Sequence, residues 1–90
     1  MAYVILCKEP NVDQYVLPDG RDDFASAQQL MSSRAEEFVD ELCVVAIENG
    51  EEPGGQTIAR DESGSIIRVL NENGGELLRM ELVAVEISNG

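Results

Sequence analysis

The sequence predicts a single α+β domain, residues 1–90, in the order ββαβββ, with one helix packed on an antiparallel sheet. Three observations support this: one segment with helical periodicity, several runs rich in Val, Ile and Leu, and turn-forming residues between them. Hydrophobic residues make up 43% of the chain, which is enough for a globular core. A chain of 90 residues is expected to fold as one domain.

Two strands are predicted before the helix. Residues 2–8 (AYVILCK) are rich in β-branched and aromatic side chains and stop before Pro10. Residues 13–17 (DQYVL) form a shorter predicted strand, closed by a Pro-Asp-Gly turn at 18–20. The two strands are expected to pair as a hairpin around residues 10–11.

A helix is predicted from residue 27 to about residue 41. Ser26 and Gln29 match the capping-box pattern, in which the serine oxygen accepts a free backbone N–H and the glutamine returns to the cap. Apolar residues behind it recur at spacings of three and four, as one stripe that faces a core. These residues are Ala27, Leu30, Met31, Ala35, Phe38 and Leu42.

Residues 42–48 (LCVVAIE), directly after this helix, are predicted as a strand that ends at Asn49-Gly50. A loop at 49–56 holds three glycines and a proline. An antiparallel meander is expected to follow, with strands at 56–60, 65–71 and 76–87, and with turns at 61–64 and at Asn73-Gly74, where both residues are expected to take positive φ. The predicted core face of the last strand is Leu78, Met80, Leu82 and Ala84.

The residue types argue against an enzyme. The chain has no histidine, which removes the commonest general base and transition-metal ligand. Cys7 and Cys43 lie in apolar runs and are expected to be small buried hydrophobes rather than zinc ligands. The glycine-rich segment 50–57 lacks the lysine of a phosphate loop, and the turn at 61–65 lacks the acid spacing of a calcium loop. We therefore expect no catalytic residue, metal site or cofactor.

The N-terminal apolar stretch ends at Lys8 and has no basic region before it. It is too short for a signal peptide or a membrane span. The expected location is the cytoplasm, with no membrane partner.

The charge is the strongest pointer to function. Six Lys and Arg stand against 18 Asp and Glu, for a formal net charge of −12. Residues 1–45 and 46–90 each carry nine acids and three bases, so there is no separate acidic tail. Such a surface repels nucleic acid and anionic membranes and attracts cationic surfaces. The expected partner is a basic protein surface.

The predicted helix concentrates this acidity. Glu36, Glu37, Asp40 and Glu41 include two like-charge pairs four residues apart, each of which costs about 0.2–0.5 kcal/mol. Asp40 and Glu41 also lie near the predicted C-terminal end, where the helix dipole disfavours anions. Acids four residues apart are about 5–6 Å apart, comparable with the roughly 3.4 to 7 Å at which phosphates recur along a strand. These four are the predicted partner-binding residues, with Asp22, Asp23, Glu51 and Glu52 as flanking contributors.

A short, acidic, single-helix chain with the helix entry FASAQQL at residues 24–30 resembles the small phage-encoded anti-CRISPR proteins. Several of these inhibit nucleic-acid-binding effector complexes, some as DNA mimics. The resemblance covers size, charge and element order. It implies a stoichiometric inhibitor that binds a basic surface of a CRISPR surveillance complex in the host cytoplasm.

Two alternatives stay open from the sequence. One is a structural protein of a high-salt cytoplasm, in which surface acid is a general adaptation. The other is an antitoxin-like interaction module, in which Val83, Val85 and Ile87 of the last strand are buried between two chains. Both a monomer and a homodimer are compatible with the pattern.

Overall fold

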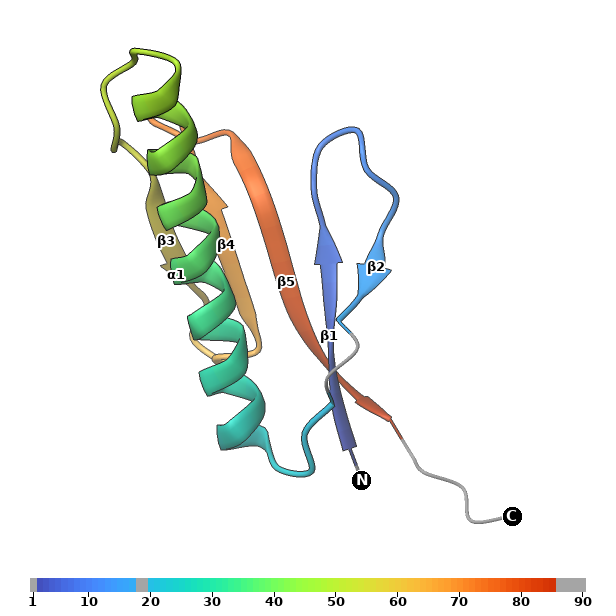
Figure 1. Cartoon of the computed structure of the whole chain (residues 1–90). Helices are drawn as coiled ribbons and strands as arrows, with labels where there is room; N and C mark the ends of the chain where they lie inside the picture. Colours follow the sequence, from blue (N-terminus) through green and yellow to red (C-terminus); the bar gives the residue numbers. More distant parts are fainter. Residues whose placement is uncertain (1, 18–19, 86–90) are drawn as a thin grey trace.

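The computed structural model describes residues 2–17 and 20–85, and it confirms the predicted α+β class (Figure 1). One helix, α1 (Phe24–Glu48), lies on one face of a five-stranded antiparallel sheet. The strands are β1 (Ala2–Lys8), β2 (Tyr15–Val16), β3 (Thr57–Arg60), β4 (Ile66–Leu70) and β5 (Glu76–Val85). Their order in the sheet is β2-β1-β5-β4-β3, so the first and last strands along the chain are neighbours.

The N-terminal hairpin is confirmed, although β2 is shorter than the predicted strand at 13–17. β1 and β2 pair antiparallel, with Cys7 opposite Tyr15. Asn11 in the connecting loop has a φ of 63°, a left-handed conformation that asparagine tolerates better than most residues. Residues 18–19 of the predicted Pro-Asp-Gly turn lie outside the described residues.

The β3-β4-β5 meander is confirmed, but the geometry of its second turn differs from the prediction. The Gly74 N–H donates to the Asn71 carbonyl at 3.0 Å, and only Gly74 of the Asn73-Gly74 pair has a positive φ, 81°. Asn71 Oδ1 accepts from the backbone N–H groups of Asn73 at 2.9 Å and Gly75 at 2.7 Å. These side-chain bonds hold a turn that needs one left-handed residue instead of two.

The helix begins earlier than predicted, and the cap at Ser26 is wrong. Asp23 is the N-cap: its Oδ1 accepts from the Ser26 backbone N–H and its Oδ2 from the Ser26 hydroxyl, both at 2.8 Å. Aspartate is at least as good a cap as serine. The earlier start also places Phe24 in the first turn, where its ring meets the Tyr3 ring edge-on at a centroid distance of 5.6 Å.

Replacing Asp23 with alanine is expected to lower the melting temperature at neutral pH, because the free N–H groups of the first turn lose their acceptor. The hydrogen bonds from Ser26 hold the pKa of the Asp23 carboxyl below its ordinary value of 3.8. A lowered folded-state pKa means that the stabilisation is present above that ordinary value and is lost as the pH falls through the lowered one. Thermal melts of wild type and D23A should therefore converge in acid, and a constant difference would contradict this role.

The helix also ends later than predicted, and the strand expected at 42–48 is wrong. Three strands therefore follow α1, as in the predicted order ββαβββ, and not the four segments predicted as strands after the helix. Residues 42–48 form the last two turns of α1. Asn49 and Gly50 are a helix cap: Glu51 N–H donates to Ala46 O at 2.8 Å and Gly50 N–H to Ile47 O at 3.1 Å, with Gly50 at a φ of 73°. An established helix adds residues at little cost until such a cap, and this outweighs the weak β preference of valine and isoleucine.

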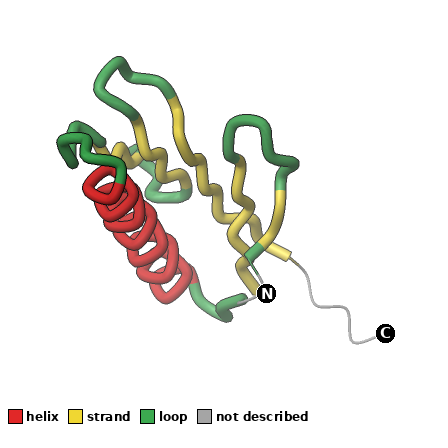
Figure 2. The backbone as a smooth tube through the Cα atoms, turned by 45° about the horizontal axis from the view of Figure 1, so that its top comes forward, coloured by secondary structure: helices red, strands yellow, loops and turns green. Residues whose placement is uncertain are grey.

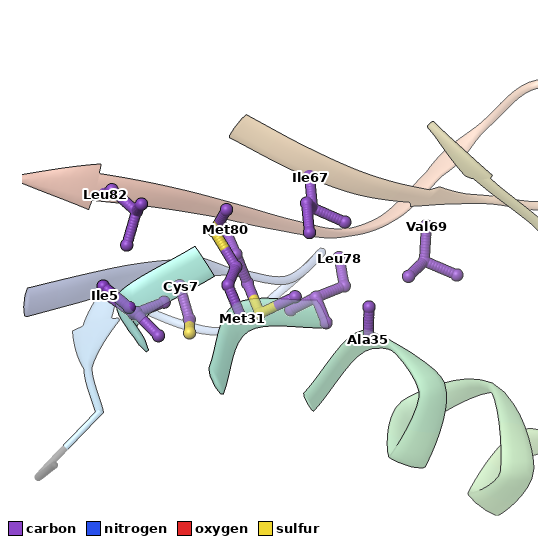
Figure 3. Packing of buried hydrophobic residues seen from close by; sticks show 10 residues of the cluster. Ile5, Cys7, Met31, Ala35, Ile67, Val69, Leu78, Met80 and Leu82 are labelled. Atoms are coloured by element: carbon purple, nitrogen blue, oxygen red, sulfur yellow. The ribbon is translucent and has the colours of Figure 1, made fainter. Parts of the chain in front are cut away.

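The core lies between α1 and the sheet (Figure 3). Its buried members are Ile5, Cys7, Ala27, Met31, Ala35, Ile67, Val69, Leu78, Met80 and Leu82. Leu30, Phe38 and Val39 of α1 pack against this cluster, whereas Leu42 is half-buried and Ala84, expected in the core, is exposed. Residues 86–87 of the predicted last strand lie outside the described residues. Among those described, no second layer covers the other face of the sheet, which we call the open face (Figure 2).

Candidate functional site

The four acids predicted on the helix are all exposed on the middle of α1. Glu36, Glu37, Asp40 and Glu41 lie within two turns, and Glu36 and Asp40 are four residues apart on one side. Asp40 is on the side of the helix opposite the buried Ala27, Met31 and Ala35. The core-facing stripe therefore leaves these carboxylates on the solvent-exposed part of the helix.

Two cations near this row were not anticipated from the sequence. Arg34 Nη1 lies 2.8 Å from Glu37 Oε2, and both side chains are about half exposed, so the ion pair adds little stability but offsets the charge of Glu37. Glu36 and Arg60 line the same open groove of about 640 Å³, which separates α1 from the β3-β4 hairpin. Arg34 could have been found from its spacing of three residues before Glu37. Arg60 could not, because β3 is distant in sequence.

The longer helix changes the electrostatic argument from the sequence. Asp40 and Glu41 lie about two turns before the true C-terminal end, and the helix dipole acts mainly within the last turn. Its unfavourable effect therefore acts on Glu48, the last residue of α1. What remains for the row itself is repulsion between carboxylates four residues apart, and this is clearest for Glu36 with Asp40.

The flanking acids do not gather around this row. Asp22 and Asp23 precede the first turn of α1, whereas Glu51 and Glu52 follow its C-terminal cap. At 1.5 Å per residue, Asp23 is roughly 27 Å from Glu41 along the helix. Asp23 is also engaged as the N-cap. The predicted residues therefore form three separate groups, before α1, at 36–41 in its middle and after its C-terminal cap.

Exposed aliphatic side chains follow the acids at 36–41 along α1. They were not predicted, because residues 42–48 were assigned to a strand. Val44 is 54% exposed and Ile47 63% exposed, and they follow Asp40 by four and seven residues on the same side of α1. Val39 is the last residue of α1 that packs against the described core. We call Val44 and Ile47, with the adjoining Glu41 and Glu48, the apolar end of α1.

The open face of the sheet holds a second unanticipated feature. Arg79 of β5 lies directly opposite Lys8 of β1 and directly opposite Arg68 of β4. Three of the chain's six basic residues therefore stand in one cross-strand row. The predicted Asn73-Gly74 hairpin already implied Arg68 opposite Arg79, since both lie five residues outside that turn. Lys8 required the pairing of β1 with β5.

The two cysteines lie on different elements, Cys7 on β1 and Cys43 on α1. Cys7 is buried and burial raises the pKa of its thiol, while Cys43 is half-buried on α1 instead of in a strand; both are free thiols. No group of three or more Cys, Asp or Glu side chains that could hold a metal occurs among the described residues. Within those same residues, α1 is too polar to cross a membrane.

Comparison of the chain with protein-family models, with curated proteins and with solved structures found no match. The proposals below therefore rest on the geometry and charge of this chain.

Proposed function

We propose that this protein is a small acidic binding protein of the anti-CRISPR type, which occupies a basic nucleic-acid-binding surface of an effector complex in the cytoplasm. The observation that carries the proposal is the exposed row Glu36, Glu37, Asp40 and Glu41 on a helix whose opposite side is anchored in the core. Anchoring matters because the helix backbone is then already ordered, so that a partner has to order only the exposed side chains on binding.

The overall charge supports the same role. A net charge of −12 steers the chain toward a cationic surface over distances at which the individual contacts do not yet exist. The row then supplies short-range pairing with Lys and Arg side chains that otherwise hold phosphates. Association by this route is fast and depends strongly on ionic strength.

The proposal is tested by competition. Purified guide-loaded CRISPR effector complexes of several types are mixed with a fluorescent target duplex, and the DNA bound is measured as the protein is titrated in. We expect at least one complex to lose DNA stoichiometrically at about 0.1 M NaCl, with a much weaker effect at about 0.5 M. The labelled duplex alone serves as the control and should not bind the protein.

Unchanged DNA binding by every complex, at a large excess of the protein and low salt, would contradict the anti-CRISPR assignment. Binding of the protein to the free duplex would contradict the mimic role, since the duplex would then be its ligand.

A further inference from the structure

The open face of the sheet has two shallow hollows beside its row of cations. Arg79 lies between them. One, of about 260 Å³, is lined by Leu6, Cys7, Lys8, Gln14, Arg79 and Glu81. The other, of about 190 Å³, is lined by Asp61, Ile66, Arg68 and Arg79. Among the described residues, no carboxylate oxygen lies within 4.0 Å of Lys8, Arg68 or Arg79, so each of the three cations lacks an ion-pair partner there.

This row works against the stability of the isolated chain. Side chains directly opposite on neighbouring antiparallel strands have Cβ atoms about 4.5–5.5 Å apart, and like charges in such positions repel. Arg79 meets that repulsion from both sides. The chain has three times as many acids as bases, yet in the described residues no carboxylate lies within ion-pairing distance of this row. An anionic surface docked on this face would remove the repulsion.

Four aliphatic side chains border the cations, together with the half-buried Glu81, which lies two residues after Arg79 on the same face of β5. By strand alternation, Val4 and Leu6 of β1, Ile66 of β4 and Val83 of β5 share the open face with Lys8, Arg68 and Arg79. These four are half-buried, and none of them packs against the core under α1. A complementary surface must therefore be both aliphatic and acidic.

The apolar end of α1 has this composition. Val44 and Ile47 project from the side of the helix away from the sheet, with Glu41 three residues before Val44 and Glu48 four residues after it. The apolar end of α1 has exposed aliphatic groups beside carboxylates, and the open face has half-buried aliphatic groups beside cations. The two surfaces therefore share apolar character and have opposite charge. The two surfaces lie on opposite sides of the molecule, so one chain cannot bring them together.

We propose that the open face of the sheet docks the apolar end of α1 from a second copy of this chain. The contact is heterologous, because it joins two different surfaces, so it either closes into a small ring or continues as an open assembly. It does not depend on the proposed function. It competes with that function for part of α1, since an α1 covered by another copy is not available to a cationic partner.

The net charge sets the conditions for this association. Two chains of −12 repel each other at long range, and at about 0.15 M salt this repulsion is screened beyond roughly 8 Å while the close ion pairs survive. Self-association should therefore be strongest near that ionic strength, and weaker both at about 0.01 M and at about 1 M NaCl.

A charge swap tests the pairing of the two surfaces. The sheet variant R68E/R79E makes the open face acidic, and the helix variant E41K/E48K makes the apolar end of α1 basic. Sedimentation velocity then measures wild type, each variant alone and an equimolar mixture of the variants. Circular dichroism melts show that each variant is folded. A separate variant, Ile47→Ser, removes an exposed anchor that does not touch the core.

Wild type is expected to associate with increasing concentration, each charge variant to stay monomeric, and their mixture to associate again because opposite charges then face each other. Ile47→Ser is expected to weaken association at least about tenfold, a size typical of an interface anchor. A monomeric wild type at millimolar concentration would overturn the proposal, as would a mixture that fails to associate or a variant that still associates alone.

Two further measurements distinguish self-association from binding of DNA to the open face and from the proposed function of α1. If a single-stranded DNA oligonucleotide binds wild type but not R68E/R79E, the open face has an anionic ligand other than a second copy, and the inference is wrong. R68E/R79E keeps every acid of α1, so it should still displace DNA in the competition assay. Failure of that displacement bears on the proposed function alone.

Discussion

Replacement of Met31 by alanine is expected to lower the free energy of unfolding by about 2–5 kcal/mol. Met31 is fully buried, and its side chain extends from α1 toward Met80 and Leu78 of the sheet (Figure 3). Truncation removes contacts on the side of the helix that anchors it and leaves a cavity that a rigid helix cannot close. For a domain of this size, such a loss is a large fraction of the total stability.

Urea denaturation followed by circular dichroism at 222 nm measures this effect. Gln29→Ala is the matched control, because Gln29 is an exposed residue of the same helix. It should change the free energy of unfolding by no more than about 0.5 kcal/mol. An equal effect of the two substitutions would mean that α1 is not anchored through Met31.

Reversal of Glu36 and Asp40 to lysine is expected to weaken binding to the cationic partner at least about 100-fold at low salt, because lysines would then face lysines and arginines. The substitution replaces one like-charge pair four residues apart by another on an exposed surface, so the helix should keep its stability. The measurement is the titration of labelled protein with the effector complex identified by the competition assay.

The control variant D13K/E62K changes the net charge by the same amount at the loop between β1 and β2 and at the turn between β3 and β4. A loss of affinity confined to E36K/D40K assigns the contact to the helix. Equal losses in the two variants would show that the partner senses the total charge and not the row on α1.

The helix shows why sequence reasoning succeeded in part. The stripe from Ala27 to Phe38 was recognisable because packing on a flat sheet demands helical spacing. The stripe continues in the half-buried Leu42 and Ala46, but Val44, Val45 and Ile47 around them are exposed, and together these valines and the isoleucine resembled a strand. The segment least constrained by the core was therefore the one assigned wrongly, and Val44 and Ile47 went unnoticed with it.

The candidate site divides in the same way. The acids at 36–41 were identified because neighbours on a helix surface follow from sequence spacing alone. The ion pair of Glu37 with Arg34 was within reach of that rule, whereas the position of Arg60 across the groove from Glu36 was not. The spread of the flanking acids depended on where α1 begins and ends, which Asp23 and Gly50 decide.

The sequence by itself determined the fold class, the positions of the hairpins and the acidity of the helix. These features depend on periodicity, turn residues and composition, all of which act over a few residues. The tertiary structure alone decided that β1 joins β5, that Lys8, Arg79 and Arg68 therefore share one row, and that the open face has no covering layer among the described residues. Such pairings join segments more than 70 residues apart, and they are selected by the packing of the whole core rather than by any local pattern.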